Sequence, residues 1–198
     1  MTNKIGGSFL VEKQGQNTVD PIRDPEQIQA MKEYLLHKSY RDYFLFAFGI
    51  NSGLRISDIV GLRVMDVRNT DHLQVKEKRT EKIRKIRMTG ALKQEIEKYT
   101  RQMADSDFLF PSRKGKGTSP IGRETAWRIV NSAARACGIR GAIGTHTMRK
   151  TFGYHFYKQT KDVAMLQQIF GHSAPSVTLR YIGFTDDMVN QAFEEFSL

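Results

Sequence analysis

The sequence predicts an α+β domain that is mainly α-helical and contains one small antiparallel sheet of three strands. Apolar residues recur at helical spacing through most of the 198 residues, whereas alternation of apolar and polar residues is confined to 64–88. The apolar content of 39% is typical of a soluble globular protein. No apolar run approaches the roughly 18 residues of a membrane span. The chain therefore has the length and composition of one domain with its own core.

The first third of the chain is expected to form three helices. The first follows Asp24, a residue type that caps helix N-termini, and has Pro25 at its first position. The second, over 40–51, is apolar nearly all round and is therefore expected in the core. Gly53 interrupts the helical pattern, and a short third helix is expected over 56–62.

The sequence pattern in the middle of the chain predicts the sheet. Short alternating segments around Leu73 and Ile86 are separated by polar turns, which predicts about three antiparallel strands within 64–88. One hairpin of this sheet is crowded with the cations Lys76, Lys78, Arg79, Lys82, Arg84, Lys85 and Arg87. Such a hairpin is either a sheet edge protected by charge or a surface for a polyanion.

The remainder of the chain returns to helical spacing. Helices are expected over 91–103, 122–137, 147–158, 162–170, 176–181 and 186–196. Gly138 and Gly171 follow two of them, at the position where a left-handed residue ends a helix. The last helix carries an apolar stripe, which predicts that it packs against this chain or a neighbouring copy.

The charge of the chain indicates which class of partner it binds. Lys and Arg number 31 against 21 Asp and Glu, which gives a net charge of +10 and a pI of about 9.8. This excess favours a nucleic acid, because each neutralised phosphate releases condensed counterions. An anionic membrane surface is the rival partner, but no expected helix pairs a basic face with an aromatic and leucine-rich face. Residues 1–20 lack the apolar stretch of a secretory signal and Cys137 is the single cysteine, so we expect a cytoplasmic protein without disulfides.

Six residues form a candidate catalytic set: Arg55, Lys78, His146, Arg149, His172 and Tyr181. Taken singly, each has an ordinary explanation. An arginine that opens a helix is usually solvated, a histidine after a helix-ending glycine can interact with the helix dipole, and a tyrosine is usually half-buried. His146 and Arg149 share a helix face at i,i+3, a spacing that often arises by chance. The order and spacing of the whole set are far more specific than any single member.

Together these residues resemble the catalytic domain of the tyrosine recombinases, the phage integrase family. The resemblance extends from about residue 24 to the C-terminus. Its motifs are GLRISD at 53–58, the basic hairpin, HTMRKTF at 146–152 and GHSAPSVTLRYIGF at 171–184. Three positions depart from the usual pattern, because Asp58 replaces Glu, Lys150 replaces a second His and Phe170 replaces Leu. None of the three removes a reacting group.

The resemblance implies the tyrosine-recombinase fold and DNA strand transfer through a 3′-phosphotyrosine. Tyr181 is the implied nucleophile. Arg55 and Arg149 are implied to stabilise charge on the phosphate, whose geometry matches the guanidinium fork. His146 and His172 are implied as further donors, with His146 as the base for the phenol.

The remaining roles are less sharply implied. Lys78, on the hairpin, is the implied general acid that protonates the leaving 5′-oxygen. Its neighbours in sequence that stay open as alternatives are Lys76 and Lys82. Asp58 is expected to orient Arg149 or the backbone near Arg55. Neither a metal ion nor an organic cofactor is implied, since cations and histidines stabilise the phosphate.

The implied partner is double-stranded DNA, bound by a tetramer on paired sites, with a monomer when free and no membrane contact. Residues 1–20 are expected to be a flexible arm or linker remnant, and 21–198 the catalytic domain. Family members usually carry an N-terminal helical domain that clamps the other face of DNA. None is recognised here, so we expect this chain alone to bind DNA weakly and nonspecifically. The stripe of 186–196 is expected to pack on its own core when free and on a neighbouring copy on DNA.

Three alternatives remain from the sequence. A type IB topoisomerase uses the same chemistry to relax supercoils without exchanging strands. A DNA-binding regulator can keep the fold and lose catalysis, although it would have no need for Tyr181 beside two histidines. A basic structural protein would leave the coincidence of motifs unexplained.

Overall fold

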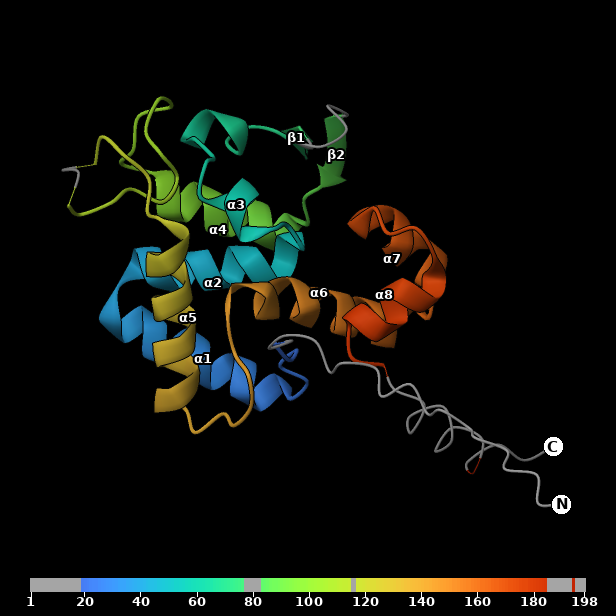
Figure 1. Cartoon of the computed structure of the whole chain (residues 1–198). Helices are drawn as coiled ribbons and strands as arrows, with labels where there is room; N and C mark the ends of the chain where they lie inside the picture. The colour runs from blue at the N-terminus through green and yellow to red at the C-terminus, as the bar shows by residue number, and fades with distance from the viewer. Residues whose placement is uncertain (1–18, 77–82, 115–116, 185–193, 195–198) are drawn as a thin grey trace, which may run out of the picture.

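Helices make up most of the structure, a computed structural model that describes residues 19–76, 83–114, 117–184 and 194 (Figure 1). The elements in chain order are α1 Pro25–Lys38, α2 Tyr40–Ser52, α3 Ile56–Ile59, the 3-10 helix η1 Val64–Asp66, β1 His72–Lys76, β2 Ile83–Arg87, α4 Gly90–Thr100, α5 Arg123–Ala136, α6 Thr145–Thr160, α7 Val163–Phe170 and α8 Pro175–Tyr181. The prediction of a mainly helical α+β domain is confirmed.

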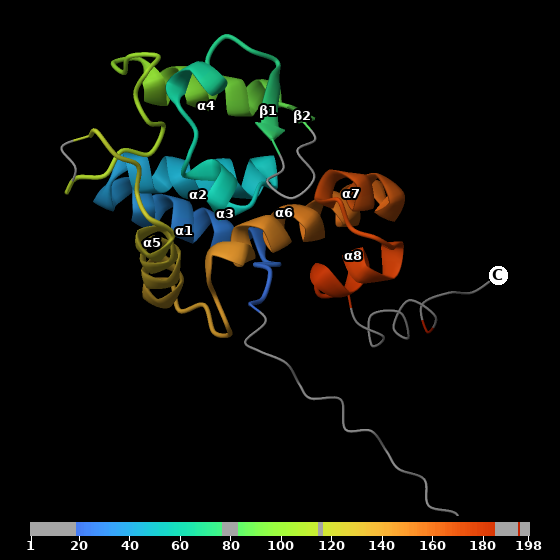
Figure 2. The same ribbon diagram turned by 45° about the horizontal axis from the view of Figure 1, so that its top comes forward.

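Helix α2 lies at the centre, between α1 and α4, with α6 beside it (Figure 2). Its side chains Phe44, Phe46 and Phe48 are fully buried. Phe44 stacks on Tyr99 of α4 with ring centroids 4.3 Å apart, and on Phe110 at 5.8 Å. Aromatic pairs of this kind add about 0.5–1.5 kcal/mol beyond the area they bury. Neighbours on several sides explain why this segment is apolar nearly all round.

Two helix starts follow caps that are visible in the sequence. The Asp24 carboxylate accepts a hydrogen bond from the Glu26 N–H at 2.8 Å, and Pro25 is the first residue of α1, as predicted. Asp162 caps α7 in the same manner, accepting from the Met165 N–H at 2.8 Å. Each cap satisfies a backbone donor that the helix itself cannot, which stabilises the helix by about 1 kcal/mol.

Other helix ends differ from prediction by a few residues. Helix α3 ends at Ile59, because the chain leaves the helix to pair elsewhere, with the Leu109 N–H donating to the Leu62 carbonyl at 2.8 Å. Helix α6 begins at Thr145, two residues before the predicted start. The predicted helix over 186–196 lies outside the described residues apart from position 194, and so does nearly all of the predicted arm.

The sheet has two described strands and not the predicted three. β1 and β2 pair antiparallel, with Leu73 opposite Ile86. The segment that opens the predicted sheet, Val64–Asp66, is instead a 3-10 helix. The Asp66 carboxylate accepts the Arg63 N–H at 2.7 Å, which closes a turn and competes with the extended backbone of a strand.

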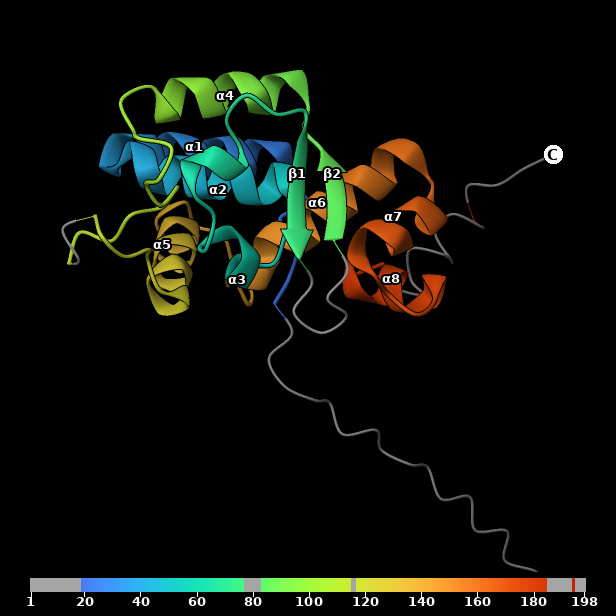
Figure 3. The ribbon, with the colours of Figure 1, turned by 90° about the horizontal axis from the view of Figure 1, so that it is seen from above.

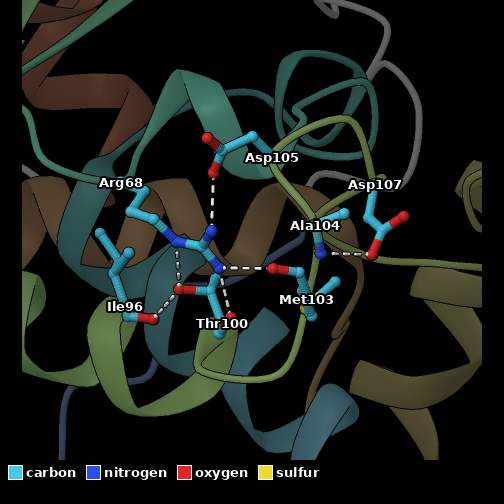
Figure 4. Close-up of polar contacts among 7 residues, drawn as sticks. All are labelled: Arg68, Ile96, Thr100, Met103, Ala104, Asp105 and Asp107. Carbon is cyan, nitrogen blue, oxygen red and sulfur yellow. Dashed lines mark hydrogen bonds and ion pairs between the residues drawn. The ribbon is translucent and has the colours of Figure 1, made fainter.

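Arg68 fastens the chain before β1 to the end of α4 (Figure 4). Its Nη2 donates to the carbonyls of Thr100 and Met103, the latter at 2.8 Å, and its Nη1 to the Asp105 carboxylate at 2.6 Å. The last carbonyls of a helix lack intrahelical partners, so this guanidinium caps α4. The start of the sheet is thereby placed relative to α4.

A second apolar cluster joins α6 to the α7–α8 pair, on the opposite side of the molecule from α5 (Figure 3). Leu166, Phe170 and Ile182 are fully buried in it. Gly153 of α6 permits the close approach, since a Cβ there would lie 2.6 Å from Ile182 Cγ2 and 2.7 Å from Phe170 Cζ.

Residues 19–23, called the strap below, lie against α6 ahead of α1. The Ile22 N–H donates to the buried Thr151 hydroxyl of α6 at 2.9 Å. The Arg23 guanidinium donates to the Gly183 carbonyl at 2.8 Å, just beyond the end of α8. The strap therefore connects the first described residues to the C-terminal helices.

Gly153→Ala is expected to lower the free energy of unfolding by about 1–3 kcal/mol, because the added methyl overlaps two buried side chains. Gly90→Ala is the matched control, since it also lies in a helix and its Cβ would meet nothing within 4 Å. Urea unfolding followed by circular dichroism measures both. Equal stability of the two variants would contradict the close packing of α6 on the second cluster.

Candidate active site around Tyr181

Tyr181, the last residue of α8, is held among aromatic and cationic side chains. Its ring meets the His172 ring edge-on with centroids 5.0 Å apart, and the Phe170 ring at 5.5 Å. The Lys150 ammonium lies over the ring, 5.2 Å from its centroid. These contacts on several sides orient the ring and so place its hydroxyl.

The hydroxyl of Tyr181 lies beside an imidazole that can accept its proton. The distance from this oxygen to His146 Nδ1 is 3.4 Å. Burial lowers the pKa of His146, and the nearby charges of Arg149, Arg55 and Lys150 lower it further. The imidazole is therefore neutral at pH 7, the form in which a ring nitrogen accepts a proton.

Two opposed effects act on the Tyr181 phenol itself. Burial raises its pKa, while the charge and hydrogen bond of Arg149 and the charge of Arg55 act to lower it. Burial is the larger effect, so the phenol stays protonated in the free protein. Loss of that proton therefore requires a base, and His146 Nδ1 lies 3.4 Å from the hydroxyl oxygen.

Arg149 is the most buried charged residue of the site, with 3% of its surface exposed. Its Nη1 donates to the Gly53 carbonyl at 2.5 Å and its Nη2 to the Phe170 carbonyl at 2.9 Å. The guanidinium also lies 4.1 Å from the centroid of the Phe170 ring. One side chain of α6 thus joins the end of α2 to the end of α7.

Arg55 reaches the site from the N-cap position of α3, with its side chain exposed. The turn that brings it there needs Gly53, whose φ of 63° is left-handed and whose Cβ would lie 2.5 Å from Phe152 Cδ1. The Arg55 charge acts on the pKa of both His146 and Tyr181, so it faces the same place as the other cations.

His172 is positioned by its own backbone and by α8. It follows Gly171, which ends α7 in the left-handed conformation. The His172 N–H donates to the Gln167 carbonyl at 3.1 Å, and the Gln167 amide donates to the His172 carbonyl at the same distance. His172 Nδ1 lies 3.0 Å from the Thr178 hydroxyl of α8. The imidazole is therefore fixed beside Tyr181.

The structure brings together five of the predicted site residues: Arg55, His146, Arg149, His172 and Tyr181. The sixth, Lys78, lies outside the described residues, as does its alternative Lys82. The other alternative, Lys76, is the last residue of β1.

Asp58 lies in α3, three residues after Arg55. Its carboxylate accepts the Ser57 hydroxyl at 3.2 Å, and its N–H donates to the Arg55 carbonyl at 2.9 Å. These contacts are local to α3, and the role of Asp58 in orienting Arg149 or the backbone near Arg55 stays a prediction.

No pattern in the sequence indicates a function for Lys150, which stands out only as a departure from the usual histidine. The structure buries it beside Tyr181, with 7% of its surface exposed. One signal was available, because residues four apart share a helix face and Lys150 follows His146 by four. Its burial depends on α8 packing over α6, which spacing alone does not predict.

The described residues contain no group of three His, Cys, Asp or Glu side chains placed to hold a metal ion. None of their helices has the length and apolar character to cross a bilayer.

Comparison with known proteins identifies the family of this chain. The model of the phage integrase family matches residues 23–187. The chain belongs to the phage integrase family. One relative is the "probable integrase/recombinase YoeC" of Bacillus subtilis strain 168, 55% identical over 178 residues that cover 90% of this chain and 97% of YoeC. Another is the tyrosine recombinase XerA of Pyrococcus furiosus, 27% identical over 175 residues that cover 87% of this chain and 60% of XerA.

Solved structures agree with the phage integrase assignment at the level of fold. The XerA recombinase crystal structure superposes with a TM-score of 0.73 at 19% identity, over 93% of this chain and 66% of that one. The XerH recombinase, in a post-cleavage complex with its palindromic difH substrate, has a TM-score of 0.71 at 18% identity, over 90% of this chain and 53% of that one. The family and fold predicted from the sequence are confirmed.

Arg149→Leu is expected to lower the free energy of unfolding by about 1–3 kcal/mol, because the Gly53 and Phe170 carbonyls lose their donor. The control is Arg135→Leu, which removes an exposed arginine from the last turn of α5 and should change stability by less than about 0.5 kcal/mol. Urea unfolding measures both variants. An Arg149→Leu protein as stable as the parent would show that these bonds do not hold the site together.

Proposed function

We propose that this chain is a site-specific DNA recombinase that cuts and rejoins strands by transesterification through Tyr181. The observation that carries the proposal is the Tyr181 hydroxyl, 3.4 Å from a histidine that is neutral at pH 7 and within reach of Arg149. A buried phenol next to a base and arginines suits attack on a phosphodiester.

The proposed step conserves atoms and charge. The Tyr181 oxygen attacks phosphorus, and its proton passes to His146. The bond from phosphorus to the 5′-oxygen breaks, and Lys78 protonates that oxygen as it leaves. Arg55 and Arg149 stabilise the charge that grows on the nonbridging oxygens. The covalent 3′-phosphotyrosine keeps the energy of the bond, so a 5′-hydroxyl can reverse the step without ATP.

His172 supplies a further donor to the phosphate in this proposal. Its ring is held through Nδ1 near Thr178 and lies edge-on to the Tyr181 ring. A donor fixed in advance needs no reorganisation when charge develops, and loss of one such donor typically slows a reaction by about 10²–10³.

Double-stranded DNA is the proposed partner, and the cytoplasm the proposed location. The net charge of +10 supports a polyanion, and two related structures, the XerH and Tn1549 integrase complexes, contain DNA. Exchange of both strands between two duplexes requires four cleavages, and each chain holds one Tyr181. We therefore propose a tetramer on paired sites that dissociates to monomers without DNA.

Tyr181→Phe is expected to abolish covalent attachment to DNA, because phenylalanine lacks the attacking oxygen. Protein is incubated with sheared genomic DNA of the source organism and denatured in detergent, and DNA bound to protein is precipitated and sequenced. Binding by this chain is expected to be weak and nonspecific, but covalent capture reports cleavage, so the parent should be recovered with its adduct on Tyr181 at the site that it cleaves. Tyr34→Phe, on α1, is the control and should capture DNA as the parent does. Capture that persists in Tyr181→Phe would refute the nucleophile.

Lys78→Ala is expected to slow cleavage of that site by about 10²–10⁴, because the 5′-oxygen leaves without a proton. A substrate with sulfur in place of that oxygen should restore the rate, since a thiolate leaves unprotonated. Lys76→Ala and Lys82→Ala are the controls and should cleave both substrates like the parent. Rescue by sulfur in either control, and not in Lys78→Ala, would move the general acid to that residue.

A further inference from the structure

Lys150 is a buried cation beside the nucleophile that the proposed reaction does not use. It is 7% exposed, and its Nζ lies 5.2 Å from the centroid of the Tyr181 ring. Its ammonium lies against the Tyr181 ring and interacts electrostatically with the Asp20 carboxylate of the strap. Lysine is rarely buried to this extent, so its place beside Tyr181 suggests a role in the site.

The surroundings of Lys150 come from the strap, α3, α6 and the α7–α8 pair. Burial lowers the pKa of Lys150, while the Asp20 carboxylate of the strap favours its charged form. His146 lies one turn earlier on the same face of α6. The other charged and titratable groups that face this place are Arg55, Arg149, His172 and Tyr181.

The Lys150 charge acts on His146. Burial is the largest cause of the lowered pKa of His146, followed by Arg149 and Arg55, and Lys150 acts in the same direction. Two cations four residues apart on a helix repel each other, so Lys150 opposes protonation of the imidazole. The same ammonium attracts the face of the Tyr181 ring.

We propose that Lys150 is a positioning residue for strand cleavage, supporting the Tyr181 ring and keeping His146 able to accept the phenol proton. This rests on the proposed function, because it concerns the step in which the Tyr181 oxygen bonds to phosphorus and its proton passes to His146. Lys150 neither gains nor loses a proton in that step.

The direction of the effect with pH follows from the role of His146. Cleavage requires the neutral imidazole, whose population rises with pH through the pKa of His146. Removal of the Lys150 charge raises that pKa, so the rate falls most below neutral pH and recovers as pH increases. A loss of packing alone would lower the rate equally at every pH.

The first test uses the free protein and needs no DNA. Nuclear magnetic resonance follows the titration of the five histidines, and His146→Gln identifies the His146 signal by its loss. In Lys150→Met the His146 midpoint should move to higher pH, and in Lys150→Arg it should stay near that of the parent. Lys158→Met, an exposed position two turns further along α6, removes the same charge and should change nothing. An unmoved midpoint in Lys150→Met overturns the proposal.

The second test measures the rate of adduct formation against pH on the captured DNA site. Lys150→Met should be about twofold slower than the parent near pH 6 and equal to it near pH 8.5, with Lys150→Arg close to the parent throughout. A uniform loss at all pH values overturns the positioning role. A parent that forms no adduct overturns the proposed function, whereas an unmoved His146 midpoint overturns the action of Lys150 alone.

Discussion

The burial of the Arg149 guanidinium is the constraint on which the site depends. A guanidinium withdrawn from water must be surrounded by acceptors, and the Gly53 and Phe170 carbonyls provide two. These carbonyls lie at the ends of α2 and α7, which precede Arg55 and His172 in the chain. The bonds that solvate Arg149 in the interior therefore also set where the side chains of Arg55 and His172 begin.

The site gathers several cations around one imidazole. Arg55, Arg149 and Lys150 all lower the pKa of His146, so their three positive charges lie close together around this imidazole and repel one another. A phosphate seated there would relieve this repulsion, and the relief would be greatest when its negative charge is greatest, in the transition state. Arg149 and Arg55 also oppose the effect that burial has on the pKa of the Tyr181 phenol, so in the proposed reaction the charge that binds the phosphate also assists the nucleophile.

Features that depend only on neighbours along the chain could be predicted from the sequence. The Asp24 cap, the glycine that ends α7 and the spacing from His172 to Tyr181 are local, and the structure contains them. The prediction of a third strand was wrong because the side chain of Asp66 bonds back to the chain. Alternation of apolar residues does not reveal such a bond. Lys150 was missed because its burial depends on α8, which arrives from elsewhere in the fold.

The strap connects the turn that follows Tyr181 to the chain before α1. Ile22 is anchored on the interior of α6, whereas Arg23 holds the Gly183 carbonyl through an exposed bond. A pull on residue 19 would load both attachments, and the exposed one opens more readily. Opening it releases the turn two residues beyond Tyr181 while α6 stays in place. Tension at this end of the domain would thus loosen the turn that follows Tyr181, and the Tyr181 hydroxyl would be held less firmly in place.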